Sequence, residues 1–182
     1  MKILAISDTH GKLNKVRDIW PKLTDIDMIL HAGDFIADAQ KLQSELGVPV
    51  IGVKGNCDGS HSSSDFRVIP VECGNILLTH GHMENVSCQL NGLMYKAMEN
   101  DCRAVVFGHT HRAMTDESSG IRFINPGSLT QPRDGSDGSY AIIRTSADSF
   151  DASIVYYSTI MGNKKLPQSG FLRNLMNYCD RF

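Results

Sequence analysis

The sequence predicts an α/β fold in which mixed β-sheets form a sandwich flanked by helices. Residues 2–53 alternate short apolar runs with amphipathic segments, the pattern of parallel strands joined by helices. Beyond residue 65 the apolar runs lie closer together and are joined by tight turns, which is typical of antiparallel strands. The length of 182 residues, with 41% hydrophobic and 21% charged content, fits one globular domain.

In the first half, residues 2–7, 28–32 and 48–53 are predicted strands, because each is a short and almost uninterrupted apolar run. Residues 12–23 and 37–46 are predicted helices. Apolar residues recur at helical spacing in the first of these segments, and a glycine directly follows the second as a stop signal.

In the second half, residues 66–73 and 76–79 are predicted to form a hairpin around a Gly74-Asn75 turn. A helix is expected over residues 87–100 and a strand over residues 104–107.

The last part of the chain is predicted to contain an antiparallel run of three strands, residues 121–124, 139–144 and 152–157. A tail follows from Gly162, with a short helical patch at residues 171–178. We expect this tail to pack on the domain or on a partner, and we assign residues 1–182 to a single domain.

Composition excludes several classes of function. A net charge of −2 argues against nucleic-acid binding by bulk charge. The five cysteines are odd in number and show no Cys-x-x-Cys spacing, so reduced thiols in a cytoplasmic protein are expected. The sequence shows no targeting segment and no apolar run of about 18 residues, so no membrane association is expected.

Five polar fragments end apolar runs, and they carry the functional prediction. The fragments are Asp8-Thr9-His10, Gly33-Asp34, Gly55-Asn56-Cys57-Asp58, His80-Gly81-His82 and Gly108-His109-Thr110-His111. Asp, Asn and His side chains bind divalent metals through oxygen and nitrogen. Because the carboxyl ends of strands in an α/β sheet open into a common crevice, these fragments predict a two-metal hydrolytic site.

Together with Asn125-Pro126-Gly127-Ser128, these fragments resemble the calcineurin-like metallophosphoesterases over residues 1–144. The resemblance is strongest to the small bacterial and archaeal phosphodiesterase branch of that superfamily. It implies a four-layer α/β/β/α sandwich of two mixed sheets, hydrolysis of a small phosphodiester, and self-association as a homodimer or homotetramer.

The resemblance also implies a role for each ligand. Asp8, His10 and His111 would bind one metal, and Asn56, His80 and His109 the other; Asp34 would bridge the two. The metals are expected to be Mn²⁺, with Ni²⁺, Fe²⁺, Zn²⁺ and Mg²⁺ as alternatives. A hydroxide shared between them would attack phosphorus.

Cys57 departs from the pattern of many phosphomonoesterases of the superfamily, which carry histidine after the Gly-Asn pair. A thiol is a weak donor and a poor acid for the leaving group. Asp58, which would orient that histidine, is present. The phosphodiesterase branch commonly shows the same Gly-Asn-Cys-Asp string, so we expect a preference for leaving groups of low pKa. Roles of Cys57 as a nucleophile or as an inert packing thiol are less favoured.

The substrate contacts are predicted at Asn56 and Arg133, and His82 is expected at the edge of the site as a ligand or as a neighbour of one. The loop at residues 125–128 either binds an oxyanion through its N–H groups or is an ordinary Pro-Gly turn. His61 is interpreted as a surface residue in preference to a substrate contact.

Structural alternatives exist for other residues. Asp8 and Asp34 each precede a predicted helix and would also serve as N-caps. His31 lies inside an apolar run, so a core or supporting role is favoured over metal ligation.

The functional alternatives are a non-catalytic protein-interaction scaffold of the same fold, as in a eukaryotic retromer subunit, and a phosphomonoesterase or nuclease. Retention of all seven ligand candidates favours the enzyme.

Overall fold

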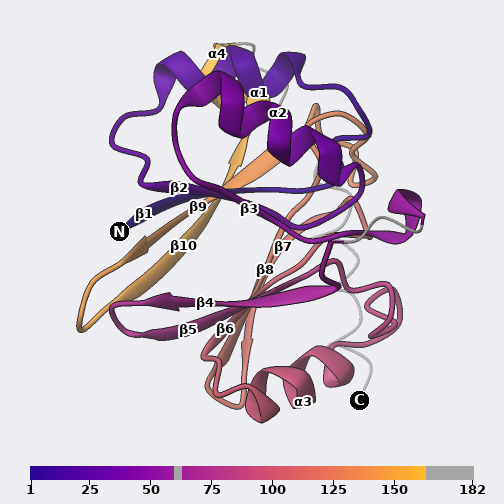
Figure 1. Ribbon diagram of the computed structural model, residues 1–182, viewed down its shortest axis with the longest axis vertical. Helices are drawn as coiled ribbons and strands as arrows, with labels where there is room; N and C mark the ends of the chain where they lie inside the picture. The colour runs from indigo at the N-terminus through magenta and orange to yellow at the C-terminus, as the bar shows by residue number, and fades with distance from the viewer. Residues whose placement is uncertain (60–62, 163–182) are drawn as a thin grey trace, which may run out of the picture.

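The computed structural model describes residues 1–59 and 63–162. Two mixed five-stranded sheets face each other, and helices cover their outer faces (Figure 1). The predicted four-layer α/β/β/α sandwich is therefore confirmed. His61 and the predicted helical patch at residues 171–178 lie outside the described residues.

The first sheet has the strand order β10-β9-β1-β2-β3. Its strands are β1 (Lys2–Ile6), β2 (Met28–His31), β3 (Val50–Gly52), β9 (Ser139–Thr145) and β10 (Phe150–Tyr156). Strands β1, β2 and β3 are parallel, and β9 pairs antiparallel with both β1 and β10. The N-terminal strand–helix alternation therefore forms the parallel half of this sheet.

The second sheet has the strand order β4-β5-β6-β8-β7. Its strands are β4 (Phe66–Val71), β5 (Gly74–Thr79), β6 (Ala104–Val106), β7 (Ala113–Ser118) and β8 (Ile121–Pro126). Strands β5, β6 and β8 are parallel, whereas β4 and β7 are antiparallel edge strands.

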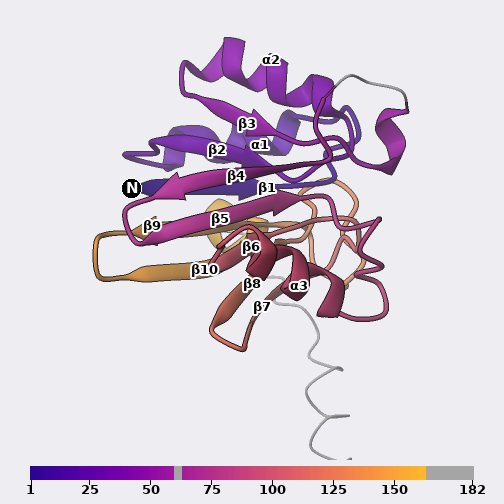
Figure 2. The ribbon, with the colours of Figure 1, turned by 60° about the horizontal axis from the view of Figure 1, so that its bottom comes forward.

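The helices form the two outer layers, as the rotated view also shows (Figure 2). They are α1 (Asn14–Ile19), α2 (Ile36–Leu46), α3 (Asn91–Glu99) and α4 (Tyr157–Met161), with the short 3₁₀ turns η1 (Trp20–Lys22) and η2 (Asn56–Asp58). Helices α1, α2 and α4 lie over the first sheet, and α3 covers the second. No helix in the described part of the chain is long and apolar enough to cross a membrane.

Apolar side chains fill three interfaces between these layers. In β1, Ile3 and Ala5 belong to the cluster between the sheets, whereas Leu4 and Ile6 pack toward α1 and α2. A third cluster joins α3 to the second sheet. Strands buried on both faces appear in the sequence as continuous apolar runs, which explains why β1 and β2 were predicted from such runs.

The predicted antiparallel run of three strands is confirmed for β9 and β10, which pair antiparallel, but it is wrong for β8. Strand β8 pairs with β6 and β7 in the second sheet, whereas β9 and β10 belong to the first. Both β8 and β9 carry buried apolar residues on each of their two faces, so the sequence pattern does not distinguish which sheet each one joins. Strand β7 was missed, because most of its side chains are exposed and it lacks an apolar alternation.

Several boundaries also differ from the predictions. The β4–β5 hairpin is confirmed, but its turn lies at Glu72 and Cys73, since Val71 pairs with Gly74. Helix α3 begins at Asn91 because turns occupy the preceding segment. Helix α1 ends where a 3₁₀ turn containing Pro21 begins. Each difference arises at an element end, where local propensity is weakest.

We expect Val106→Ala to destabilise the fold. Val106 is fully buried between the two sheets, so the truncation removes apolar burial and leaves a cavity, with a cost of about 1.5–3 kcal/mol. Urea denaturation measures the change in unfolding free energy. The control is Val68→Ala in β4, where the side chain is 37% exposed; equal losses in the two variants would contradict this account of the core.

Candidate metal centre

The predicted ligands lie in loops at one end of both sheets. Asp8 and His10 follow β1, Asp34 follows β2, and Asn56 lies in η2 beyond β3. His80 and His109 follow β5 and β6 of the facing sheet. These loops gather at the right-hand end of the sheets in Figures 1 and 2. The parallel strands of each sheet point the same way, so their carboxyl ends bring the side chains together.

Most of these residues adopt an unfavourable backbone conformation. Five of the seven ligand candidates have positive φ: Asp8 (54°), His10 (48°), Asp34 (58°), His109 (68°) and His111 (56°). The left-handed region is sparsely populated by residues other than glycine, and such strain concentrates at functional sites. The surrounding structure therefore holds these side chains against a local cost.

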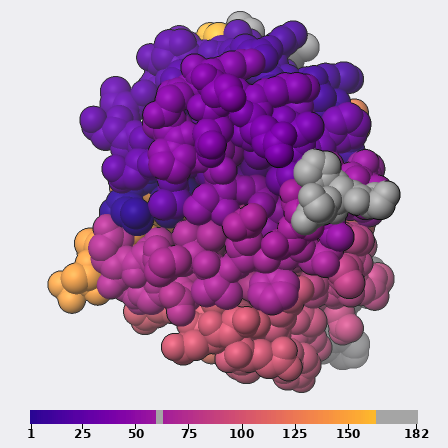
Figure 3. Space-filling view, viewed as in Figure 1, coloured from indigo at the N-terminus to yellow at the C-terminus, as the bar shows by residue number. Residues whose placement is uncertain are grey.

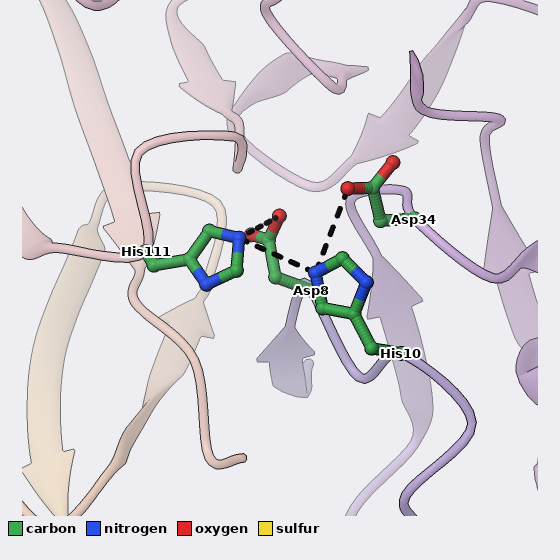
Figure 4. Close-up of side chains that lie close together, drawn as sticks. All are labelled: Asp8, His10, Asp34 and His111. Atoms are coloured by element: carbon green, nitrogen blue, oxygen red, sulfur yellow. Dashed lines mark hydrogen bonds and ion pairs between the residues drawn. The ribbon is translucent and has the colours of Figure 1, made fainter. Parts of the chain in front are cut away.

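Four of the side chains form the first half of the centre (Figure 4). One ligand atom from each of Asp8, His10, Asp34 and His111 lies within 4.8 Å of the others. The Nε2 atoms of His10 and His111 are 3.3 Å apart. His111 Nε2 is 3.3 Å from Asp8 Oδ1, and His10 Nε2 is 3.6 Å from Asp34 Oδ2.

The other three candidates form the second half. Asn56 Oδ1 lies 3.1 Å from His80 Nε2 and 3.0 Å from His109 Nδ1. His80 Nε2 is also 3.4 Å from Asp34 Oδ1. Asp34 therefore directs one carboxylate oxygen toward each half, which is the geometry a bridging ligand needs.

Backbone carbonyls set the tautomers of two ring ligands. His80 Nδ1 donates to the carbonyl of Ala32 at 2.7 Å, and His111 Nδ1 donates to that of Gln131 at 2.7 Å. Burial lowers the pKa of His80 to about 4 and also lowers the pKa of His111. Both rings are thus neutral, with an Nε2 lone pair directed into the centre. This arrangement is the usual one for a histidine that binds a metal.

The environment of the Asp8 carboxylate indicates whether a cation fits among these side chains. Its Oδ1 atom is buried and has no hydrogen-bond partner, although His111 Nε2 faces it at 3.3 Å. Burial raises the pKa of Asp8 to about 7, a hydrogen bond from Ser7 opposes this rise, and the charge of Asp34 adds to it. A buried acceptor that faces a second acceptor is costly unless a cation lies between them. The residues present therefore fit a divalent metal ion.

Asp34 behaves differently from Asp8. Burial acts to raise its pKa, but the adjacent His80 ring and the hydrogen bonds of Cys57 outweigh that effect and lower it. The backbone N–H of Cys57 donates to Asp34 Oδ1 at 2.9 Å. Asp34 is accordingly an ionised carboxylate in this environment. Gly55 leaves room for it, because a Cβ atom there would collide with Asp34 Oδ1.

The loop that begins at Asn125 supports Asp8. The hydroxyls of Ser128 and Thr130 donate to the carbonyl of Asp8 at 2.9 and 3.1 Å. The N–H groups of Thr130 and Gln131 donate to Ser128 Oγ, and that of Gly127 donates to Asn125 Oδ1. These N–H groups are used within the loop, so the oxyanion-binding alternative is wrong for them. The loop positions the metal centre instead.

A buried polar network holds the Asp8–Gly11 turn against α2. The Thr9 hydroxyl donates to Asp38 Oδ2 at 2.8 Å and lies 3.0 Å from His31 Nε2. The Gly11 N–H donates to the same Asp38 oxygen, and the Gly33 N–H donates to His31 Nδ1. His31 is fully buried, so its predicted supporting role agrees with this network.

Sequence reasoning missed Thr9, Asp38 and Asn125 as residues that shape the centre. Asn125 Nδ2 donates to the carbonyl of Gly108 at 2.8 Å, directly before His109. Asp38 lies among buried positions of α2. A carboxylate on the apolar face of a helix is a signal that could have identified it.

Asp58 and Cys57 lie beside Asp34 but differ in their contacts. Asp58 accepts from the N–H groups of Ile36 and Gly55, each at 2.7 Å. Its carboxylate therefore ties η2 to the start of α2. Cys57 is exposed, but partial desolvation of its thiol and the hydrogen bond of that thiol to Asp34 raise its pKa to about 11. A thiol held protonated in this way is a poor nucleophile.

His82 and Arg133 lie at the rim. The His82 ring is centred 5.4 Å from that of His80, and its Nδ1 atom is buried without a hydrogen-bond partner. Arg133 is exposed, and its backbone N–H donates to the carbonyl of His111 at 2.9 Å. Its charge adds to the effect of burial in lowering the pKa of His109 and of His111. The guanidinium charge therefore acts on these two ligand candidates.

A family model for the calcineurin-like phosphoesterase superfamily domain matches residues 1–148. The chain belongs to this superfamily. The protein named "Probable metallophosphoesterase YsnB" of Bacillus subtilis (strain 168) is 32% identical over 158 residues, which are 86% of this chain and 90% of YsnB. Phosphodiesterase YfcE of Escherichia coli (strain K12) is 26% identical over 171 residues, covering 79% and 87% of the two chains.

Solved structures show the same fold. A predicted phosphoesterase from Streptococcus pneumoniae TIGR4 superposes with a TM-score of 0.73 at 25% identity, covering 86% of this chain and 90% of that one. Vps29 of Entamoeba histolytica, determined as a complex with Zn²⁺, has a TM-score of 0.69 at 22% identity, with 86% and 99% covered. The chain is thus a phosphoric ester hydrolase of the small phosphodiesterase branch by homology.

We expect Thr9→Val to destabilise the protein. The substitution leaves Asp38 and His31 buried without the hydroxyl between them, so the unfolding free energy falls by about 1–3 kcal/mol. Thermal and urea unfolding measure the loss. Thr24→Val, at an exposed position, is the matched control. If both variants unfold like the wild type, the network does not hold the turn.

Proposed function

We propose that this protein hydrolyses a small phosphodiester at a dinuclear metal centre. The arrangement of the Asp34 carboxylate, with one oxygen toward His10 and the other toward His80, carries the proposal. Asp8, His10 and His111 would hold one ion, and Asn56, His80 and His109 the other, with Asp34 between them. Mn²⁺ is the ion we expect from the family resemblance, and the carboxylate and amide oxygens suit it; the imidazole ligands also suit the alternatives Fe²⁺, Ni²⁺ and Zn²⁺.

The charge of the ligand set suits an anionic substrate. Two carboxylates do not neutralise two divalent cations, and the other ligands are neutral rings and an amide. The loaded centre would keep a positive charge that attracts a phosphate group. When bound, the two ions would polarise the phosphoryl oxygens and lower the pKa of a water molecule.

The chain's own groups would bind and orient the ester. The Arg133 guanidinium suits a phosphate oxygen, because it presents paired N–H donors. Asn56 is exposed, and its Nδ2 donates to Cys57 Sγ at 3.4 Å while its oxygen faces His80 and His109. The second N–H of this amide would be the donor to a bound ester. His82 carries an unpaired ring nitrogen beside the same group of side chains.

Cys57 limits which esters react. Its thiol is a weak proton donor, so a leaving group would depart without strong acid assistance. Phosphodiesters with leaving groups of low pKa are the substrates that this site suits.

The geometry of all seven ligand candidates argues against the scaffold alternative. A surface that only binds proteins has no need of five strained backbone positions.

We further propose a cytoplasmic location, self-association as a homodimer or homotetramer, and a single domain over residues 1–182. Size-exclusion chromatography with light scattering tests the oligomeric state of the full chain.

Metal removal is expected to abolish hydrolysis. The Mn²⁺-loaded protein is assayed on bis(4-nitrophenyl) phosphate and on 4-nitrophenyl phosphate, with and without chelator. We expect the diester to be cleaved faster, and activity to be lost with chelator and restored by Mn²⁺. Equal rates on the two esters would favour a phosphomonoesterase, and full activity with chelator would exclude the metal mechanism.

Asp34→Asn is expected to lower turnover by roughly a hundredfold or more, because even outer-shell partners of metal ligands cost 10–100-fold. The amide removes one oxygen ligand and the negative charge between the two halves. Steady-state kinetics and metal content by mass spectrometry check this result. The control is Asp148→Asn at an exposed position. An Asp34→Asn enzyme with most of its activity would overturn the bridging role.

Cys57→His is expected to raise the rate on diesters with poorly activated leaving groups. An imidazole is a better proton donor near neutral pH, and general acids of this kind typically contribute about 10²–10⁴-fold. The comparison uses alkyl and 4-nitrophenyl diesters, and the gain is expected for the alkyl ester. If neither rate rises, position 57 is not the acid position.

A further inference from the structure

Phe35 breaks three local preferences at once. It is a large apolar side chain that is 39% exposed. Its φ of 69° places it in the left-handed region, directly after Asp34 in the same region. It also occupies the N-cap position of α2 without a side-chain cap, where Ser, Thr, Asp or Asn is preferred. Residues that break local rules in this way are expected at functional positions.

The fold supports this unfavourable placement from outside. Asp58 accepts the N–H of Ile36, and so supplies the cap that Phe35 lacks. The Phe35 ring meets the His10 ring edge-on, with centroids 5.5 Å apart. It also lies over Gly11, where a Cβ atom would be 3.6 Å from two ring carbons. The ring is therefore held against the turn that carries His10.

Packing of the core does not explain Phe35. It belongs to none of the three apolar clusters, and the buried face of α2 begins at Ile36 and continues through Ala39 and Leu42. An aromatic ring anchored on one side and open on the other is suited to contact a bound molecule.

The position of Phe35 relative to the metal centre indicates which kind of molecule its ring would contact. The Phe35 ring meets the ring of His10, and the His10 ring stacks on that of His111 at a centroid distance of 5.1 Å. Phe35 therefore lies next to the half of the centre formed by Asp8, His10, Asp34 and His111. A phosphate held at this half of the centre would have Phe35 within reach of one of its substituents. The group that points toward Phe35 is then an ester substituent.

We propose that Phe35 forms an apolar wall that binds the organic substituent of the phosphoester. The substrate class is accordingly one with an aromatic or heterocyclic group next to the phosphate. This inference rests on the proposed function, since it places the phosphate at the same centre. Phe35 acts in specificity and takes no part in the chemical step.

The test compares binding of phenylphosphonate and methylphosphonate to the full-length, Mn²⁺-loaded protein by isothermal titration calorimetry. The two probes share the phosphonate and differ in the group that would reach Phe35. We expect the wild type to bind phenylphosphonate more tightly, and Phe35→Ala to reduce this preference about two- to tenfold, the size of one aromatic contact. Phe35→Tyr keeps the ring and is expected to keep the preference.

Tyr95→Ala is the matched control, because Tyr95 is an exposed aromatic residue on α3, 60% exposed and away from the centre. Several results would overturn the inference: no preference in the wild type, an unchanged preference in Phe35→Ala, an equal loss for both probes, or a loss in Phe35→Tyr. Phe35→Leu, which keeps apolar bulk without a ring, decides the matter if the alanine variant does not fold; it is expected to lose part of the preference.

Turnover separates this inference from the proposed function. On aryl diesters, Phe35→Ala is expected to raise KM about two- to tenfold with kcat and metal content unchanged. If the wild type discriminates between the phosphonates but hydrolyses no ester, the proposed function fails and the role of Phe35 stands. If hydrolysis is intact and neither KM nor the phosphonate preference changes, only the role of Phe35 fails.

Discussion

The carboxylate of Asp34 joins two groups of side chains, and each group takes residues from both sheets. One oxygen faces His10 from the loop after β1, and the other faces His80 from the end of β5. This contact requires the sheets to be stacked with their parallel strands ending at the same side. The three apolar clusters secure that stacking, since they fill the space between the sheets and beneath both helical layers. The space-filling view, seen from the same side as Figure 1, shows the N-terminal segments packed directly on the part of the chain that leads to α3 (Figure 3).

The strain of the ligand loops is offset by hydrogen bonds that the loops do not make for themselves. Ser128 and Thr130 hold the Asp8 carbonyl, Thr9 connects its turn to Asp38 in α2, and Asn125 holds the loop before His109. Each of these bonds spans a long stretch of sequence. A backbone conformation that local propensity disfavours can therefore persist, because distant parts of the chain determine it.

The rim of the centre combines a positive group with apolar ones. Arg133 lies beside His111, Phe35 lies beside His10, and the protonated thiol of Cys57 lies beside Asp34. Under the proposed function, this set would favour binding of a phosphate that carries an organic substituent, and it would offer little acid assistance to the departure of that substituent. A diester with a stable leaving group would meet both conditions.

The sequence was sufficient to predict the α/β class, the strand–helix alternation to residue 53 and the polar fragments at the strand ends. Apolar runs and polar end residues are local patterns, and they persist in any arrangement of the elements. His31 was also predicted correctly as a supporting residue, because a histidine inside an apolar run has few other roles.

Other features were decided by the tertiary structure alone. The sheet that β8 joins, the edge strand β7, the supporting roles of Thr9, Asp38 and Ser128, and the position of Phe35 all depend on contacts between segments far apart in the chain. A strand that is apolar on both faces fits either sheet, and a hydroxyl or an aromatic ring takes its role from the groups it meets. The sequence by itself thus determined which chemistry is present at the strand ends, whereas only the packing of the two sheets decided which atoms face one another.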